Sequence, residues 1–408
     1  MERFDNGNYD IHIIGTGLAG LTLYKELKSK GKNVCLIESN ICELNTCSIS
    51  QSSLNHLSLT EYRHSGLGGT GVKWGGGCTL FEKEDFDKWH IDYDSMQKYY
   101  KKACDILQID YSELIQKNNY EIFNSEFITN KFISGFNLIS KIKGENVKNL
   151  LDKETIREIS KDIFYFTVTN VENNILTLND GKKEIKINYK KCVLCCGGLE
   201  TARLLLNSGL KNENLGKYYS PHLSVKKGKC ILNKNIRKNS MYSNNISKYF
   251  IYKNADGSSM RVIITDELDI IIQSDQIPNI NSKIELTDDK DSFNNRNILL
   301  THKAYDEDFE RIIECYNDLD AELKKNNLGY VDDIPNLEDI KNLTCGASHH
   351  MGTTRFGKNI KDGVVDHNFK VFGMDNVYIL STSLFSTYSH AHPTLTLISL
   401  VFNFLDLF

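Results

Sequence analysis

The sequence has no excess of positive charge and very little proline. It holds 49 lysines and arginines against 53 aspartates and glutamates, a formal net charge of −4. This balance predicts no strong attraction to nucleic acid or to an anionic membrane surface. The four prolines in 408 residues reflect a compositional habit and carry no functional signal. The length allows one large domain or two intermeshed ones with a sizeable core.

Long apolar runs of the kind that mark targeting or membrane segments are also missing. The start, MERFDNGNYD, is polar and has no signal-peptide core. The run PTLTLISLVFNFLDLF at 393–408 is short for a membrane span and contains Asn403 and Asp406, so we predict a buried helix there. We therefore expect a cytoplasmic protein without an integral membrane segment.

The cysteines show no metal-ligand spacing. There are eleven, an odd number, and Cys192, Cys195 and Cys196 come closest to a cluster. These three lie in the apolar run KKCVLCCGG, where small buried thiols are predicted in place of ligands. No metal site is expected.

A dinucleotide-binding pattern is present near the start, in IHIIGTGLAGLTLYKELKSKGKNVCLIES (residues 11–39). An apolar strand enters a GxGxxG turn, a helix follows, and a second strand ends on an acid. The first glycine permits the tight turn, the second lets the backbone approach a pyrophosphate, and the third lets helix and strand pack closely. The motif does not separate FAD from NAD, and its acid disfavours NADP. The predicted nucleotide contacts are Gly15, Gly17, Leu18, Ala19, Gly20 and Glu38.

A second glycine-dense segment, RHSGLGGTGVKWGGGCT, occupies residues 63–79. Such density indicates backbone that must come close to something flat or tightly curved. A flexible linker is the alternative, but Trp74 and the apolar flanks argue against it. The following stretch begins as a loop and becomes an amphipathic helix with apolar spacing at Met96, Tyr99, Tyr100 and Ala103.

Seven pieces together resemble the glucose–methanol–choline (GMC) oxidoreductases, FAD-dependent alcohol oxidases and dehydrogenases. They occur in the family's order along nearly the whole chain, and none is decisive alone. The pieces are GTGLAG with its acid, LGGTGVKWGGG, WHIDYDSMQKYY, VLCCGGLETARLLLNS, NLGKYYSPHLSV, QIPNINSKIELTDDKDSF, and HHMGTTRFG with the later HPTLTL.

The resemblance implies an α/β (α+β) fold. A Rossmann-like FAD-binding domain would be assembled from discontinuous segments, 1–222 and 341–408, with a smaller antiparallel-sheet substrate domain at 223–340. The substrate sheet is expected mainly from 223–305, where MRVIIT, LDIIIQ and SKIEL alternate with period two. A helix is predicted over 305–326 from its apolar spacing.

The resemblance also implies further contacts to FAD. Some relatives tether the cofactor through a histidine before the tryptophan; Lys73 stands there, so we expect non-covalent FAD. The family's aspartate near the penultimate strand is missing; YILSTSLF offers Ser381 and Ser383 there, and Ser383 is taken as the contact. The implied contacts are Gly68, Gly69, Thr70, Trp74, Gly75, Gly76, Val168, Gly197, Ser383, Pro393 and Thr394.

Two histidines carry the implied chemistry. His349, three residues before a Gly-Thr pair, matches the family's catalytic base, and His392, before Pro393, matches its partner. Alcohol oxidation needs a base for the hydroxyl proton and an acceptor for the hydride, and a neutral imidazole suits the first task. The second histidine would steady the developing alkoxide, although the two could share these roles.

Nearby residues receive plainer interpretations. His350 is expected to pack or hydrogen-bond structurally, and His390 to be a satisfied surface histidine. For Arg355 a flavin contact and a structural ion pair are equally open, while His302 is not expected to face the pocket.

The function implied is oxidation of a small-molecule alcohol, most closely a secondary hydroxyl of a sugar or sugar derivative, to a ketone. A non-sugar alcohol is the alternative, and a non-catalytic flavin-binding protein the second. An NAD-dependent dehydrogenase would leave the second glycine segment and HPTLTL unexplained; other FAD classes lack the histidine pair. The acceptor that reoxidises the flavin remains open among oxygen, a quinone and a redox protein.

Overall fold

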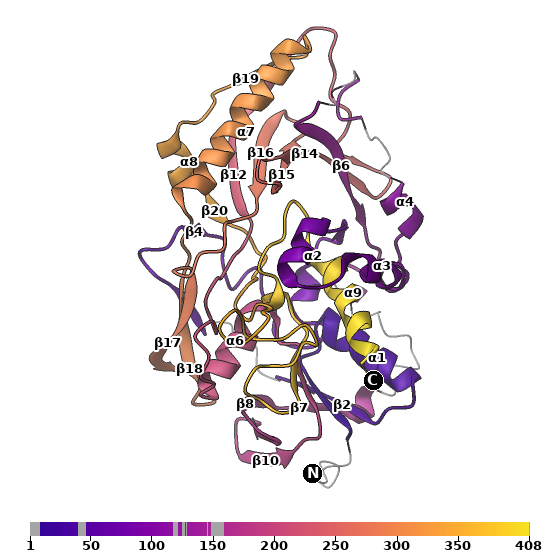
Figure 1. Ribbon diagram of the computed structural model, residues 1–408, viewed down its shortest axis with the longest axis vertical. Helices are drawn as coiled ribbons and strands as arrows, with labels where there is room; N and C mark the ends of the chain where they lie inside the picture. The colour runs from indigo at the N-terminus through magenta and orange to yellow at the C-terminus, as the bar shows by residue number, and fades with distance from the viewer. Residues whose placement is uncertain are drawn as a thin grey trace.

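The computed structural model describes residues 9–39, 46–116, 121–124, 127, 129–144, 146–147 and 159–407. Residues 1–8, where no targeting segment is expected, lie outside this part. The lower half of the molecule in Figure 1 is built on a five-stranded parallel sheet. Its strands in spatial order are β21 (Val377–Ile379), β11 (Cys192–Leu194), β1 (Ile11–Ile14), β2 (Val34–Glu38) and β7 (Ile163–Tyr165).

Apolar sequence explains this sheet. Strands β1, β2 and β11 are buried along their whole length, as expected for parallel strands covered on both faces. Helix α1 (Leu18–Ser29) connects β1 to β2, and α6 (Gly197–Asn207) follows β11. Helix α9 (Pro393–Leu405) packs between α1 and α3 (Tyr93–Leu107), which confirms the buried helix predicted at the C-terminal run.

The upper half contains a ten-stranded sheet that is antiparallel apart from one edge pairing. Its central order is β12-β16-β15-β14-β6, and Figure 1 shows α7 lying across it. The strands are β4 (Asn55–His56), β20 (Cys345–Gly346), β12 (Leu223–Leu232), β16 (Asp269–Ser274), β15 (Ser259–Ile264), β14 (Ile246–Lys253), β6 (Phe132–Ile139), β5 (Gly77–Cys78), β13 (Tyr242–Ser243) and β19 (Gly329–Asp332).

Most strands of this sheet come from 223–305 as predicted, but one predicted strand belongs elsewhere and other segments join the sheet. MRVIIT and LDIIIQ form β15 and β16 as expected, but β6 pairs with β14 although it precedes residue 223. SKIEL lies outside the sheet, in β17 (Lys283–Lys290), which pairs with β18 (Arg296–Thr301) and packs on α6. Alternation identifies a half-buried strand but not the sheet to which it belongs.

Two small sheets and the remaining helices complete the fold. Strands β17 and β18 form a sheet with β3 (Cys47–Ile49), while β8 (Thr167–Glu172), β9 (Ile175–Asn179) and β10 (Glu184–Asn188) form another. The helices are α2 (Lys83–Trp89), α4 (Tyr111–Ile115), α7 (Asp306–Lys325) and α8 (Leu337–Leu343). The amphipathic helix predicted through Met96, Tyr99, Tyr100 and Ala103 is α3, and the helix predicted over 305–326 is α7, so both are confirmed.

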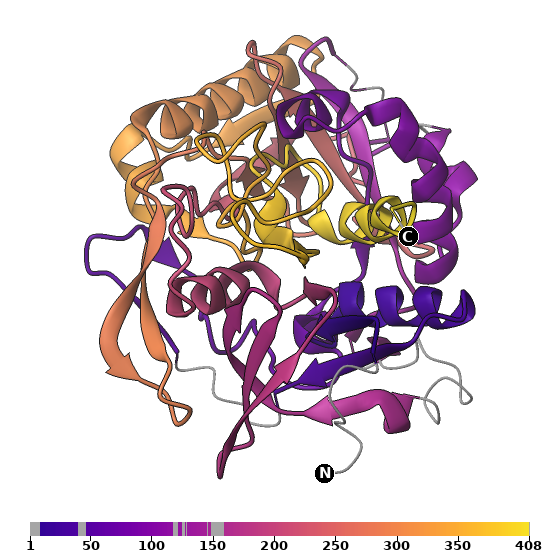
Figure 2. The ribbon, with the colours of Figure 1, turned by 60° about the horizontal axis from the view of Figure 1, so that its bottom comes forward.

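A second hydrophobic core lies under α7. Phe309, Ile312 and Tyr316 of that helix pack on sheet residues such as Val262 and Ile272. In Figure 2 the C-terminal segment, in yellow, lies between this upper layer and the parallel sheet. Among the described residues, no helix combines the length and apolar character needed to cross a membrane.

Candidate active site

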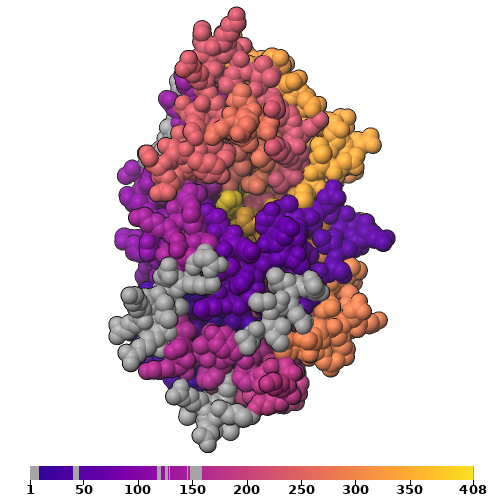
Figure 3. Space-filling model, turned by 180° about the vertical axis from the view of Figure 1, so that it is seen from behind, coloured from indigo at the N-terminus to yellow at the C-terminus, as the bar shows by residue number. Residues whose placement is uncertain are grey.

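A large cavity, about 1020 Å³, lies where the parallel sheet, the ten-stranded sheet and the C-terminal segment meet. Ligand pockets usually occupy about 300–1,000 Å³, so this one has room for an extended ligand. In Figure 3 yellow atoms of the C-terminal segment are visible in the hollow between the upper part and the indigo N-terminal part. The predicted residues that line the cavity are Gly15, Gly17, Leu18, Ala19, Glu38, Gly69, Thr70, Trp74, Gly75, Val168, Gly197, His349, His392, Pro393 and Thr394.

The first glycine motif forms one end of the cavity. Gly15 has φ +99°, and Gly17 has no heavy atom within 4 Å of a Cβ placed on it. Gly20 does not line the cavity. A Cβ there would stand 2.0 Å from the Gly15 carbonyl oxygen, so this glycine allows the close packing of helix and strand. Glu38 lines the cavity and accepts hydrogen bonds from N and Oγ1 of Thr16, at 2.7 and 2.5 Å.

The second glycine segment lies against the first. A Cβ on Gly69 would stand 2.9 Å from Cα of Gly17, so these two backbones touch. Gly68 and Gly76 are turn residues with φ +93° and +86°, and neither lines the cavity. The segment is therefore a structured wall and not a flexible linker.

Ser383 is a correction to the predicted cofactor contacts. It is fully buried behind the wall and hydrogen-bonds to the hydroxyls of Ser381 and Thr354, at 2.6 and 2.5 Å. Ser381 lines the cavity instead. Ser381 caps the 3₁₀ turn η4 (Thr382–Leu384), and only this first serine reaches the cavity, which the run STSLF alone does not reveal.

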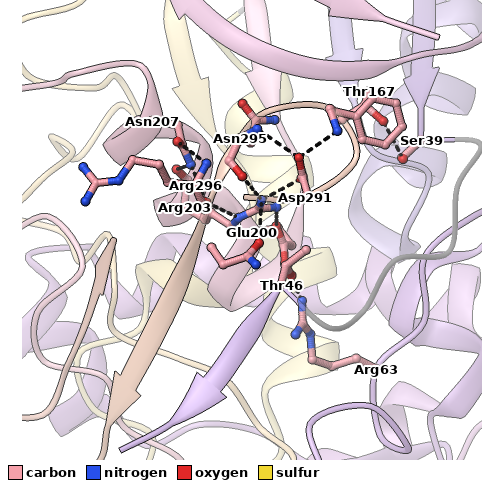
Figure 4. A network of polar contacts seen from close by, with 12 residues as sticks. Ser39, Thr46, Arg63, Thr167, Glu200, Arg203, Asn207, Asp291, Asn295 and Arg296 are labelled. Atoms are coloured by element: carbon pink, nitrogen blue, oxygen red, sulfur yellow. Dashed lines mark hydrogen bonds and ion pairs between the residues drawn. The ribbon is translucent and has the colours of Figure 1, made fainter. Parts of the chain in front are cut away.

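A buried ionic network closes the far end (Figure 4). Glu200 of α6 accepts from Arg63 at 2.6 Å and from Arg203 at 3.1 Å, and Arg203 also reaches Asp291 at 2.7 Å. Burial raises the pKa of Glu200, but the two arginines outweigh it, so that the net pKa is lowered. The network ties the β17–β18 hairpin to α6 and to the second glycine segment.

The fold brings the two predicted catalytic histidines together. The rings of His349 and His392 have centroids 5.0 Å apart, although 43 positions separate them in sequence. Each meets a further polar group: His349 Nδ1 lies 2.9 Å from Nδ1 of His222, and His392 Nε2 lies 2.5 Å from Nη1 of Arg261.

Hydrogen bonding determines which nitrogen of each ring carries the proton. His222 Nε2 lies 3.2 Å from the Ser389 carbonyl, which only accepts, so His222 donates there and its Nδ1 is an acceptor. His349 must then donate from Nδ1, which leaves a lone pair on its Nε2. Arg261 only donates, so His392 accepts at Nε2 and holds its hydrogen on Nδ1.

The surroundings keep both rings neutral. Burial, with a smaller effect of the Arg261 charge, lowers the pKa of His349 to about 4. Burial and then Arg261 lower the pKa of His392 well below its usual value. A neutral imidazole with a free lone pair is a proton acceptor, and one with a free N–H is a donor.

Other residues differ in part from expectation. His350 hydrogen-bonds to the Tyr219 hydroxyl at 2.9 Å as a structural residue, although it also lines the cavity. His390 is not on the surface: it is 4 % exposed and hydrogen-bonds to Ser259 at 3.0 Å. His302 is buried away from the cavity, 2.8 Å from Gln276.

Arg355 and the cysteines complete the comparison. Arg355 lies over the Tyr218 ring at 3.6 Å and does not line the cavity, a cation–π contact that neither expectation included. Cys192 and Cys195 are buried as predicted, whereas Cys196 is half-buried; Cys195 and Cys196 both line the cavity.

Sequence reasoning missed two residues of the site, His222 and Arg261. His222 stands in NLGKYYSPHLSV, a segment used only for resemblance. Arg261 did carry a signal: it interrupts the apolar strand MRVIIT, which is buried on both faces. A cation in such a strand needs a specific reason to be there.

Comparisons with family models identify the chain in two stages. Residues 9–230, more than half of the chain, match the family model described as pyridine nucleotide-disulphide oxidoreductase. This match identifies the chain as an oxidoreductase. Residues 278–400, which include His349 and His392, match the model described as GMC oxidoreductase. The chain belongs to the GMC oxidoreductases and is an FAD-dependent oxidoreductase.

Solved structures share the fold at low identity. A pyridoxine 4-oxidase from Mesorbium loti is 14% identical, with a TM-score of 0.68 over 98% of this chain and 99% of that chain. A formate oxidase is 14% identical with a TM-score of 0.67, over 98% of both chains. A variant of formate oxidase from Aspergillus oryzae is 14% identical with a TM-score of 0.68, again over 98% of both. No curated protein matches the chain.

The two motif glycines should respond differently to alanine. Gly17→Ala meets no neighbouring atom in the protein, so we expect unchanged stability of the cofactor-free chain and at least about tenfold weaker FAD binding. Gly20→Ala drives a Cβ into the Gly15 carbonyl and should cost about 2–4 kcal/mol of unfolding free energy. Urea unfolding of the cofactor-free protein and fluorescence titration with FAD measure the two effects. Equal destabilisation by both variants would contradict this division.

Proposed function

We propose that the protein oxidises an alcohol to a carbonyl compound, with His349 as the base. The observation that carries the proposal is the hydrogen-bond chain from the Ser389 carbonyl through His222 to His349. It fixes the His349 proton on Nδ1 and leaves Nε2 free to accept the hydroxyl proton of a substrate.

The proposed roles of the chain's residues follow from these tautomers. His349 takes the hydroxyl proton at Nε2, and His222 holds its ring in orientation. His392 donates from Nδ1 toward the oxygen on which negative charge develops, with its own ring held by Arg261. FAD, when bound, supplies the acceptor for the hydride from the same carbon.

The cofactor assignment within the cavity is part of the proposal. The room beside Gly17 and the acceptor oxygens of Glu38 fit the pyrophosphate and ribose of FAD. We further propose 1–222 with 341–408 as the FAD-binding part and 223–340 as the substrate part, apart from β6 and the β17–β18 hairpin described above. Lys73 before Trp74 favours non-covalent FAD.

Within the alcohols we propose a sugar or sugar derivative oxidised at a secondary hydroxyl. The support is the polar lining on the ten-stranded-sheet side, where side-chain amides can hydrogen-bond several hydroxyls. These residues are Asn137, Asn244, Asn245 and Gln273. The neighbours named for pyridoxine and formate show that the shared fold takes other substrates, and both compounds therefore belong in the test.

Anaerobic flavin reduction tests the function. The purified holoenzyme is mixed without oxygen with sugars, sugar derivatives, pyridoxine and formate, and its visible absorbance is followed. We expect bleaching by at least one sugar-type alcohol, and recovery of colour on adding oxygen, a quinone or a dye. A protein that binds no FAD, or a yellow protein that no alcohol bleaches, would contradict the proposal; bleaching by pyridoxine or formate alone would contradict the sugar class.

A further inference from the structure

Arg261 is a buried cation in the wall of the cavity. It lies in the middle of β15, is 2% exposed, and its guanidinium sits 4.2 Å above the Tyr249 ring. Its Nη1 is 2.5 Å from His392, so it adjoins the reacting end of the cavity and not the nucleotide end.

No carboxylate neutralises Arg261 within the described residues. Its acceptors are the uncharged Nε2 of His392, Oδ1 of Asn137 at 3.2 Å and the His390 carbonyl at 2.8 Å. The neutral Tyr249 hydroxyl is a further hydrogen-bond partner. Nε is buried and has no partner. Arg203 is also buried, but its charge is neutralised in the usual way, by ion pairs with Glu200 and Asp291.

The acids of the cavity are engaged elsewhere. Among the described lining residues the carboxylates are Glu38, Glu200 and Asp291, and all three have partners at the nucleotide end. A buried charge is strongly unfavourable unless an opposite charge or strong hydrogen bonds compensate it. The reacting end therefore retains one permanent positive charge that the folded chain itself leaves unpaired.

A neighbouring side chain can complete an anion site. Gln273 of β16 is the direct cross-strand partner of Arg261 and also lines the cavity. Opposed residues of an antiparallel pair point to the same face, so the guanidinium and this amide lie side by side. Their N–H groups are the donors that a carboxylate or phosphate accepts.

We propose that the substrate carries an anionic group, a carboxylate or a phosphate, which Arg261 binds beside the hydroxyl that His349 deprotonates. This deepens and rests on the proposed function, and it narrows the sugar derivative to a sugar acid or sugar phosphate. Electrostatic attraction would also orient the substrate, because the charged group is held at β15 while the hydroxyl meets the histidines.

Two measurements on the holoenzyme test the proposal. In the first, oxidised enzyme is titrated with acetate, with inorganic phosphate and with acetamide, and the flavin difference spectrum reports binding. In the second, anaerobic reduction rates are compared between glucose and its anionic counterparts glucuronate and glucose 6-phosphate. The variants are Arg261→Gln and Arg261→Lys, with Arg355→Gln as control, because Arg355 also covers a tyrosine ring but lies outside the cavity.

We expect an anion to bind where acetamide does not, and Arg261→Gln to weaken this binding about 10- to 100-fold. The preference for the anionic substrate over glucose should fall by the same factor, with a partial recovery in Arg261→Lys and no change in Arg355→Gln. A residue that only positioned His392 would slow both substrates equally. Whether acetate or phosphate binds identifies the group.

The failures can be told apart. The anion site would be overturned if glucose reduced the flavin faster than both anionic sugars and if acetate and phosphate left the flavin spectrum unchanged. Alcohol oxidation would still stand in that case. An Arg261-dependent response to anions in an enzyme that no alcohol reduces would keep the anion site and overturn the oxidation.

Discussion

Replacing His349 with alanine should slow anaerobic reduction of the flavin by about 10²- to 10⁴-fold, the usual contribution of a positioned general base. The FAD content should not change, because the fold places His349 at the reacting end of the cavity and not at the glycine motifs. Stopped-flow absorbance with the best substrate from the panel gives the rate, and the flavin spectrum gives the occupancy.

His367→Ala is the matched control, since that histidine is exposed on a turn. In this variant the substrate should reduce the flavin at the same rate as in the parent enzyme. A His349→Ala enzyme within about threefold of the parent rate, with bound FAD, would remove His349 from the base role, since a base is worth far more than that.

The folded protein should lose stability steeply as the pH falls below 6.5. Burial lowers the pKa of many histidines, to about 4 for His12 and His349 and to about 3 for His302, whereas the unfolded chain takes up these protons near 6.5. Each such group removes about 1.4 kcal/mol per pH unit between 6.5 and its folded pKa. The others shifted downward are His56, His222, His350, His390 and His392.

Buried aspartates act in the opposite direction but are fewer. Burial raises the pKa of Asp85 and Asp308 to about 6 and that of Asp275 to about 7, so the folded chain takes up these protons first and gains stability as the pH falls. The histidines outnumber them, and we expect a net loss of about 3 kcal/mol or more between pH 6.5 and 5.

Urea unfolding at several pH values measures this slope. His12 lies in β1, 2% exposed, and its Nδ1 has no partner, so His12→Leu isolates one group. This variant should flatten the slope by about 1.4 kcal/mol per pH unit. An unfolding free energy that stays level or rises from pH 6.5 to 5 would contradict the expectation.

The sequence was most informative where local pattern and motif coincide. The βαβ unit at 11–38, the buried C-terminal helix and the convergence of His349 with His392 were all foreseen and are present. Each depends on short-range spacing or on a motif whose parts the fold must bring together.

The remainder depends on pairing between distant segments. Nothing in FISGFNLI reveals that β6 pairs with β14, more than a hundred residues later in the chain. SKIEL has the same alternating pattern as MRVIIT and LDIIIQ, although it belongs to the sheet of β17 and β18. The partners of the catalytic histidines, His222 and Arg261, could not be predicted from the sequence either, because only the pairing of distant strands brings them to the site. The run STSLF likewise does not show that Ser381 reaches the cavity and Ser383 does not.

The position of β11 has a consequence for biosynthesis. This interior strand is flanked by β1, made from residues 11–14, and by the edge strand β21, made from residues 377–379, with α9 later still. A nascent chain on the ribosome therefore exposes an apolar sheet edge until almost the whole described sequence has emerged. The cavity is therefore complete only once Pro393 and Thr394, which line it, have emerged.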